Sequence, residues 1–254
     1  MGNIKMDIMT SHPALVSFWD FQEEAGQARK DYGPYGYALL EGSGGPVARE
    51  EDGVFGDYSA RIEEGKWFHI PRASCPALNL SGPNARLTVA AWVKRGHKSN
   101  TQCEFLAGMW NETGAKRQYG LFLNLWIWDS GEQVCGHISS TGGPTEGHPW
   151  CMDASIGETR VPREEWQFVA ITYDGRYVRS YLNGVLDQRE IRNPYEYPGG
   201  IYEGGVDGAD FTVAAVDRLG EIGNFYVGSL GGLAVYEEAL AEEELLALAQ
   251  ATAT

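Results

Sequence analysis

The side chains best suited to ligand chemistry lie on two predicted strands, Gln118–Trp126 and Gln133–Ser139. Successive side chains of a strand point to opposite faces, so alternation separates the Leu, Val and Ile residues from a polar and aromatic set. With Arg117 at the rim, this set consists of Arg117, Gln118, Asn124, Trp126 and His137. Planar hydrogen-bonding groups beside a stacking ring can recognise a saccharide. If the two strands are neighbours, we predict a saccharide-binding groove, the alternative being a hydrated sheet face with one incidental histidine.

A long loop follows the second of these strands. The segment Ser139–Asp153 (SSTGGPTEGHPWCMD) contributes His148, Trp150 and Asp153 to the predicted groove. Its Gly-Gly-Pro and Pro-Trp elements restrict the backbone, so the loop can present an aromatic tip in one conformation. The alternative is a loop that packs Trp150 on the edge of the fold.

Carboxylates gather in a second long loop, Asn193–Asp210. Glu203, Asp207 and Asp210 supply the oxygen ligands that a hard cation such as Ca²⁺ prefers. Their spacing is not that of an EF-hand loop. Calcium is therefore an optional ligand in this interpretation, and saccharide binding requires no cofactor.

The sequence lacks the carboxylate pair of a common glycosidase mechanism. A retaining glycosidase needs two carboxyl groups facing one cleft, and no Glu-x-Asp-x-x-Glu run occurs; residues 50–52 and 242–244 are contiguous charges typical of solvated surface. An enzyme remains an alternative, namely a polysaccharide lyase or an atypical glycoside hydrolase. His137 and Arg117 would then be the catalytic candidates. Tyr119 falls on the apolar face, which argues against it as a base.

The elements that position these residues are predicted to be strands. The clearest signal runs from Trp166 to Gln188, where Asp174-Gly175 and Asn183-Gly184 separate three apolar runs. Asp-Gly and Asn-Gly favour tight hairpin turns because they tolerate positive φ. Two such turns in succession predict a three-stranded antiparallel meander.

One helix is predicted, from Leu240 to about Gln250. The longest stretches without strand signals are Ser139–Glu165 and Arg189–Asp210, and loops of that length are usually functional. Many short strands with one terminal helix indicate an all-β fold, a two-sheet antiparallel jelly-roll sandwich with a short C-terminal helix. No composition break divides the chain, so we expect one domain over residues 1–254 with a core from about 14 to 250.

The net charge of −15 and the pI of about 4.7 exclude some partners. A surface this acidic repels phosphate backbones and anionic membranes, so no nucleic acid and no membrane partner is expected. Residues 1–13 contain no apolar stretch of a signal peptide, and no segment reaches the roughly 18 apolar residues of a membrane helix. The sequence predicts a soluble protein, secreted only if the chain is a trimmed piece, and its location stays open.

Four cysteines are too few for a disulfide-stapled scaffold, and none forms a C-x-x-C motif. They are Cys75, Cys103, Cys135 and Cys151. If a disulfide forms, Cys135 with Cys151 is the preferred pair. Buried free thiols are the alternative.

Four segments of the sequence resemble one known family. They read LVSFWDFQEEAG with KDYGPYGYALL, LTVAAWVK, WQFVAITYDGRYVRSYLNGVLD and LGGLAVYEEALAEEEL. Together they resemble laminin-G-like domains of the concanavalin A-like lectin/glucanase superfamily, from residue 15 to residue 245. The resemblance implies the two-sheet jelly roll. Its members include lectins, adhesion modules, hydrolases and lyases, so function must come from the site.

The resemblance favours a lectin-like domain that binds an oligosaccharide or polysaccharide, with a protein-interaction module as a third hypothesis. Asp20 and Asp31 match acidic positions of the family's opening and are further calcium candidates. Residues 230–233 read Leu-Gly-Gly-Leu where many relatives carry Ile-Asp-Glu-Val, which weakens the usual calcium site. Trp19, Trp92 and Trp166 lie in the matched strands and are predicted to be core.

Overall fold

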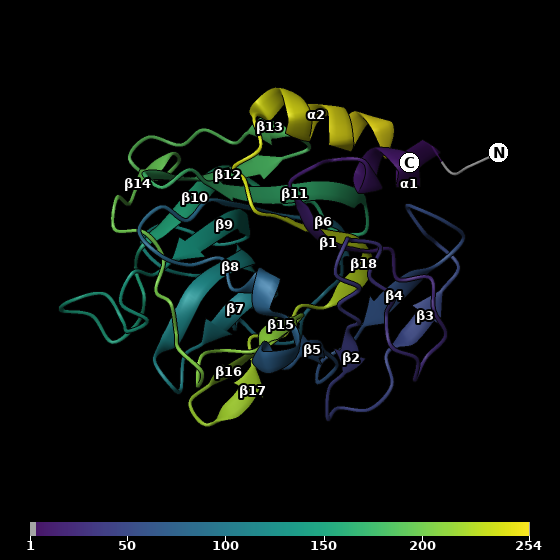
Figure 1. Ribbon diagram of the computed structural model, residues 1–254, viewed down its shortest axis with the longest axis horizontal. Helices are drawn as coiled ribbons and strands as arrows, with labels where there is room; N and C mark the ends of the chain where they lie inside the picture. The colour runs from purple at the N-terminus through teal and green to yellow at the C-terminus, as the bar shows by residue number, and fades with distance from the viewer. Residues whose placement is uncertain (1–3, 254) are drawn as a thin grey trace.

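Two β-sheets packed face to face form the body of the computed structural model, which describes residues 4–253 (Figure 1). The first sheet consists of β13 (Val185–Leu186), β12 (Tyr177–Leu182), β11 (Trp166–Tyr173), β6 (Leu87–Arg95), β18 (Gly228–Tyr236), β4 (Ser59–Ile62) and β3 (Ala48–Glu50), with β1 (Leu15–Trp19) on β18 and β14 (Tyr195–Glu196) on β12. The second consists of β10 (Ala154–Arg160), β9 (Gln133–Ile138), β8 (Lys116–Asn124), β7 (Glu104–Asn111), β15 (Phe211–Val213), β5 (Phe68–Ile70) and β2 (Leu40–Glu41), with β16 (Val216–Arg218) on β7 and β17 (Glu221–Gly223) on β16. The predicted all-β two-sheet sandwich is confirmed.

The central strands of the first sheet are buried on both faces. On β6, Val89 and Ala91 face the second sheet, whereas Ala90 and Trp92 face outward into another apolar cluster. A strand buried on both sides reads as a continuous apolar run, which explains the sequence LTVAAWV.

The predicted meander is present as β11, β12 and β13. Asn183 and Gly184 have φ of 52° and 81°, as a tight hairpin turn of this type requires. At the other turn only Gly175 has positive φ, because the Asp174 carboxylate accepts hydrogen bonds from the N–H groups of Arg176 and Tyr177.

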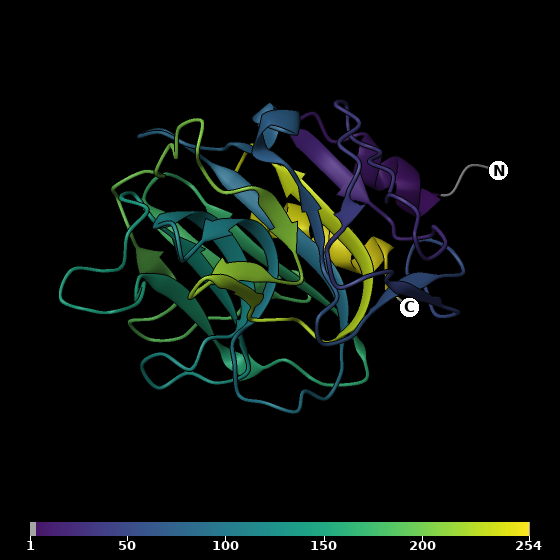
Figure 2. The same cartoon turned by 90° about the horizontal axis from the view of Figure 1, so that it is seen from below.

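Two helices cover the outer face of the first sheet (Figure 1). They are α1 (Ile4–Thr10) and α2 (Glu242–Ala251), and two 3-10 turns, η1 (Arg72–Ser74) and η2 (Pro76–Leu78), precede β6. Helix α2 begins at Glu242, two residues after the predicted start at Leu240, and the sequence did not predict α1. Figure 2 shows β1 running beside β18, with which it pairs. No helix in the described part of the chain is long and apolar enough to cross a membrane.

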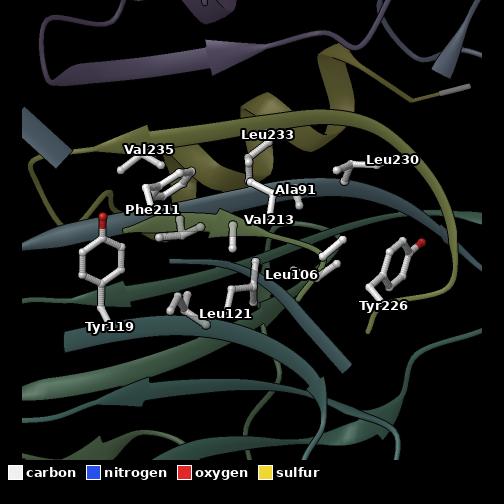
Figure 3. Packing of buried hydrophobic residues seen from close by; sticks show 14 of the residues in the cluster. Ala91, Leu106, Tyr119, Leu121, Phe211, Val213, Tyr226, Leu230, Leu233 and Val235 are labelled. Carbon is white, nitrogen blue, oxygen red and sulfur yellow. The ribbon is translucent and has the colours of Figure 1, made fainter. Parts of the chain in front are cut away.

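The space between the sheets is filled by a large apolar cluster (Figure 3). Leu106 and Leu121 of the second sheet meet Leu233 and Val235 of the first. Tyr119 lies in the same cluster and donates its hydroxyl hydrogen bond to the carbonyl of Leu78 at 2.7 Å. Burial raises the Tyr119 pKa well above its ordinary value, so this residue is a packing group and not an exposed base.

Two sequence predictions are wrong in detail. Strand β10 lies inside the stretch 139–165 that was predicted to be loop. Its last three residues, 158–160, are polar and exposed, so the sequence shows no apolar run of strand length there. Trp166 is partly buried rather than core, since it sits at the first position of β11 and donates a hydrogen bond to Asp52 at the surface.

Candidate functional site

Three ring side chains pack together on the outer face of the second sheet. Trp110 of β7 lies over His137 of β9, with ring centroids 4.9 Å apart and planes tilted by 30°. Phe122 of β8 meets the same imidazole edge to face at 5.2 Å. Gly120 pairs directly with His137, and a Cβ at this glycine would lie 2.9 Å from the Phe122 ring. Glycine is therefore needed for the rings to lie against the sheet.

A cavity of about 170 Å³ opens over these rings, and we call it the Trp110 cavity. Its apolar lining consists of Trp110, Phe122, Leu125, Trp126, Ile127 and Trp150, and its polar lining of Cys103, Glu112, Arg117, His137, Cys151, Arg218 and Asn224. Pockets for drug-sized ligands measure about 300–1,000 Å³. The Trp110 cavity is smaller and suits one compact ligand unit.

His137 presents a neutral imidazole to this cavity. Its Nδ1 lies 2.8 Å from the carbonyl oxygen of Asp153, which can only accept, so Nδ1 carries the hydrogen and Nε2 is the acceptor. Burial lowers the His137 pKa to about 4, against the opposing effect of the Asp153 carbonyl and carboxylate. At neutral pH this residue offers a hydrogen-bond acceptor without charge.

Glu112 follows β7 and supplies the carboxylate of the cavity. Its Oε1 accepts hydrogen bonds from Trp110 Nε1 and Asn224 Nδ2, both at 3.3 Å. Burial raises the Glu112 pKa, while the charges of Arg117 and Arg218 act in the opposite direction. The carboxyl group is thus held in place by two neutral donors.

Two guanidinium groups face the same cavity. Arg117, at the start of β8, is almost fully buried and donates from Nη1 to the Gly142 carbonyl at 3.3 Å. Arg218 ends β16, and its Nε is buried without a hydrogen-bond partner in the described part of the chain. With Glu112 ionised and His137 neutral, the two arginines leave one positive charge in excess.

Two tryptophans form an exposed rim around these polar groups. Trp126 is 53% exposed and Trp150 is 42% exposed, although both are large apolar side chains. Trp126 follows β8 with φ of 54°, a left-handed conformation that turns the chain out of the strand. An exposed ring beside a cavity is available to stack on a ligand.

The loop residues 139–153 reach the cavity through Trp150, whereas His148 and Asp153 do not line it. His148 is exposed and meets the ring of Trp128 edge to face, with centroids 5.9 Å apart. The Asp153 carboxylate accepts from Thr145 Oγ1 at 2.5 Å and from the Tyr195 hydroxyl at 2.8 Å. Asp153 therefore ties the loop, through Thr145, to Tyr195 of β14.

Gln118 and Asn124 also lie outside the cavity, because β-bulges interrupt the alternation that nominated them. Trp110 pairs with Arg117 and Met109 with Tyr119, which leaves Gln118 without a cross-strand partner. Its amide instead contacts Arg72 Nη1 and Asn79 Oδ1, at 2.7 and 2.8 Å.

Asn124 is displaced by a second irregularity, between Glu104 and Phe105 of the neighbouring strand. It pairs with Glu104, whose carboxylate forms a buried ion pair with Arg95 of the first sheet at 2.7 Å. Of the eight residues nominated for binding, the structure thus brings together Arg117, Trp126, His137 and Trp150.

The lining residues Trp110, Glu112, Arg218 and Asn224 were not among the site residues predicted from the sequence. Trp110 lies near the end of β7, and strand alternation that allows for bulges could have found it. The hairpin of β16 and β17 reaches β7 through a parallel bridge between Asp217 and Asn111. No local pattern signals a contact across about one hundred residues.

The nominated carboxylates do not form one metal centre. Among residues 4–253, no group of three His, Cys, Asp or Glu side chains could hold a metal ion. Asp31 accepts hydrogen bonds from Ser17 Oγ and from three backbone N–H groups. These bonds connect strand β1 to the loop of residues 31–37. Burial raises the pKa of Asp20 to about 6. In the second loop, Asp207 is exposed, Asp210 accepts from the Arg72 N–H, and Glu203 accepts from the Gly205 N–H.

All four cysteines are free thiols, so the preferred pair of Cys135 and Cys151 is not joined. Both lie in the apolar cluster on the outer face of the second sheet. Burial raises the pKa of Cys151 to about 11, which keeps it a thiol at neutral pH.

Comparison with known families gives one match. The model of a family described as the concanavalin A-like lectin/glucanases superfamily matches residues 72–246, more than two thirds of the chain. No curated protein matches the sequence.

Several solved structures share the fold. Domain 4 of AbnA, an extracellular arabinanase of Geobacillus stearothermophilus solved in complex with arabinotriose, has a TM-score of 0.61 at 18% identity, over 93% of this chain and 98% of that domain. The ligand-binding domain of botulinum neurotoxin serotype D, in complex with N-acetylneuraminic acid, gives 0.56 at 11% identity, over 97% of this chain and 52% of its own length. Trypanosoma rangeli sialidase with the inhibitor DANA gives 0.57 at 16% identity, over 92% and 32%. At these identities the likeness shows the fold.

Proposed function

This chain belongs to the concanavalin A-like lectin/glucanases superfamily, and from that premise we propose that it binds one sugar unit of a saccharide in the Trp110 cavity. The observation that carries the proposal is the rim. Trp126 and Trp150 are exposed and line the same cavity as Glu112, Arg117, His137 and Arg218. Exposed tryptophans placed this way serve a ligand better than they serve packing.

The polar lining matches the hydroxyl groups of a sugar. Each hydroxyl both donates and accepts, so a sugar site needs acceptors and donors together. His137 Nε2 and the Glu112 carboxylate accept, whereas Arg117, Arg218 and the Asn224 amide donate. A net gain of about 0.5–1.5 kcal/mol for each hydrogen bond, added to ring stacking, gives the modest affinity typical of one small ligand.

The neighbours in fold support the same class of ligand. The arabinanase domain is described with arabinotriose and the neurotoxin domain with N-acetylneuraminic acid. Both are saccharides, and they differ in charge and size. The neighbours therefore favour saccharide binding as a class.

A glycan array with matched tryptophan variants tests the proposal. Trp128 is 50% exposed, has φ of 54° like Trp126, and does not line the cavity, so Trp128→Ala is the control for Trp126→Ala. Removing a stacking tryptophan costs about 2 kcal/mol, a roughly thirtyfold loss of affinity. We expect that loss in Trp126→Ala and wild-type binding in Trp128→Ala, at equal melting temperatures. An array without any bound glycan, or equal losses in both variants, would contradict the proposal.

Catalysis on a bound saccharide is the second candidate, and Glu112 is the observation that favours it. A buried carboxyl with a raised pKa can donate a proton to a leaving oxygen. The basic atom facing the same cavity is His137 Nε2, and a pKa of about 4 makes it a weak base. Release of reducing ends from a bound glycan, lost in Glu112→Gln, would establish turnover. Binding without such release would leave recognition as the function.

A further inference from the structure

The charge of the Trp110 cavity differs in sign from the charge of the whole chain. The protein carries −15, yet Arg117 and Arg218 face the cavity against the single carboxylate of Glu112. His137 contributes no charge at neutral pH.

Within residues 4–253, neither cavity arginine has a carboxylate within ion-pair distance, although both act on Glu112 from farther away. The ion pairs within 4.0 Å in the described residues involve other cations, such as Arg95 with Glu104 and Arg29 with Glu41, and include neither Arg117 nor Arg218. This is notable in a chain with 35 acidic residues. Arg117 is buried and Arg218 is half-buried, and guanidinium groups without a close carboxylate keep strong donors available for an anionic ligand.

Arg218 is held in place by its own hairpin. Its aliphatic stem lies over Gly223, where an added Cβ would approach the Arg218 Cδ to 3.1 Å. The pairing of Arg218 with Glu221 across β16 and β17 fixes the strand end that carries it. The guanidinium is thereby presented to the cavity with its Nε buried and unpartnered.

We propose that the Trp110 cavity takes a carboxylated sugar unit and that the ligand carboxylate lies against Arg117 and Arg218. The inference rests on the proposed saccharide function and narrows it to a ligand class. A planar guanidinium binds a carboxylate through two parallel hydrogen bonds, which makes arginine the side chain suited to this group. One carboxylate balances the one positive charge in excess.

The acidic surface limits how much negative charge the ligand carries. Exposed charges act over about 8 Å at physiological ionic strength, so the −15 charge repels a long polyanion as it approaches. A single carboxylate that enters the cavity contacts the arginines directly and is screened from the surface. The ligand is therefore a unit with one carboxylate, at the end of a chain or free, and not a polyanionic polymer.

Matched sugar pairs that differ only in the carboxylate test the inference. The probes are methyl glucuronide against methyl glucoside and methyl galacturonide against methyl galactoside, titrated into the wild-type chain and followed by NMR or calorimetry. We expect at least tenfold tighter binding of the acidic member in one pair, with a preference that weakens as salt increases. In Arg218→Gln the preference should fall to twofold or less.

Two further variants sharpen the test. Glu112→Gln removes the competing negative charge and should strengthen binding of the acidic sugar severalfold. Arg192→Gln is the control, because Arg192 lies over the Trp128 ring outside the cavity and its loss should leave the preference unchanged. Circular dichroism and melting temperature verify that each variant is folded.

The outcomes separate the two levels of the proposal. Neutral sugars that bind as tightly as acidic ones, with Trp126→Ala reducing both, would overturn the carboxylate inference and leave the saccharide function standing. A preference for the acidic member that survives in Arg218→Gln would also overturn it. Failure of every sugar to bind would overturn both.

Discussion

The two outer faces of the sandwich both carry a buried tryptophan among other rings, but different elements cover them. Each carries a tryptophan that is nearly inaccessible, Trp92 on the first sheet at 3% exposure and Trp110 on the second at 2%. Each indole is surrounded by other rings, Trp92 by Phe18, Phe55 and Phe168, and Trp110 by Phe122 and His137. The difference lies in what covers them.

Helix α2 closes the first face with Leu245 and Leu248, and Trp92 Nε1 donates to Thr252 Oγ1 at the end of that helix, at 2.6 Å. Loops cover the second face, and they leave Trp110 in one cavity with Glu112, Arg117 and Arg218. A rigid sheet below and loops above is the arrangement in which binding sites usually occur.

Cavity size does not distinguish the two faces. The cavity beside the end of α2 is larger, about 310 Å³, and is lined by Trp92, Trp166 and Phe168. Its amides satisfy each other, since Asn183 Nδ2 donates to Gln167 Oε1 at 2.8 Å. The Trp110 cavity differs because, in the described part of the chain, Arg218 Nε has no hydrogen-bond partner and neither Arg117 nor Arg218 has an ion pair within 4.0 Å.

Truncating the covered tryptophan should have the largest effect on stability. We expect Trp92→Ala to lower the free energy of unfolding by roughly 3–5 kcal/mol, the usual cost of removing a buried large aromatic side chain. Urea denaturation measures this loss, and glycan binding at low temperature should be retained. Loss of binding in a variant that remains folded would show that the two faces are coupled.

Removing the hydrogen-bond partner of Trp92 should have a smaller effect. In Thr252→Val the indole N–H is left buried without an acceptor, which costs roughly 1–3 kcal/mol. Thr252→Ser keeps the hydroxyl and is the control. A stability of Thr252→Val equal to that of the wild type would mean that the end of α2 does not seal this face.

The second face should respond to pH through His137. The unfolded chain binds a proton near pH 6.5 and the folded chain only near pH 4, so stability is lost as pH falls between these values and is unaffected above pH 6.5. Between pH 7 and pH 5 the loss amounts to about 2 kcal/mol.

Comparison with His137→Gln isolates this contribution. Asp20, whose pKa is raised to about 6, acts in the opposite direction because its folded form keeps a proton below that pH. This effect is common to both proteins and cancels in the difference. A wild type that loses no more stability than His137→Gln at pH 5 would refute the buried neutral imidazole.

The sequence predicted those features that depend on neighbouring residues. The meander of β11, β12 and β13 follows from an Asn-Gly turn between apolar runs. The outward direction of His137 follows from regular alternation on β9, where Val134 and Ile138 enter the core between the sheets. Both predictions need only local geometry.

The missed features depend on irregularity and distance. A bulge opposite Met109 and Trp110 places Arg117 rather than Gln118 beside the Trp110 ring, and nothing in the alternating pattern marks where a bulge occurs. Arg218 reaches the cavity because β16 pairs with β7. Such a contact is decided by the packing of the whole sheet.

The left-handed backbone at Trp126 has a consequence for how this segment evolves. Glycine adopts φ near 54° without the steric cost of about 1 kcal/mol or more that an indole-bearing residue has there. Selection for thermal stability alone would therefore favour glycine at position 126, and the same change would remove the ring from the cavity rim. Selection for ligand binding keeps tryptophan. Among related chains, we expect tryptophan at this position in those that bind the ligand and glycine or asparagine in those that have lost ligand binding.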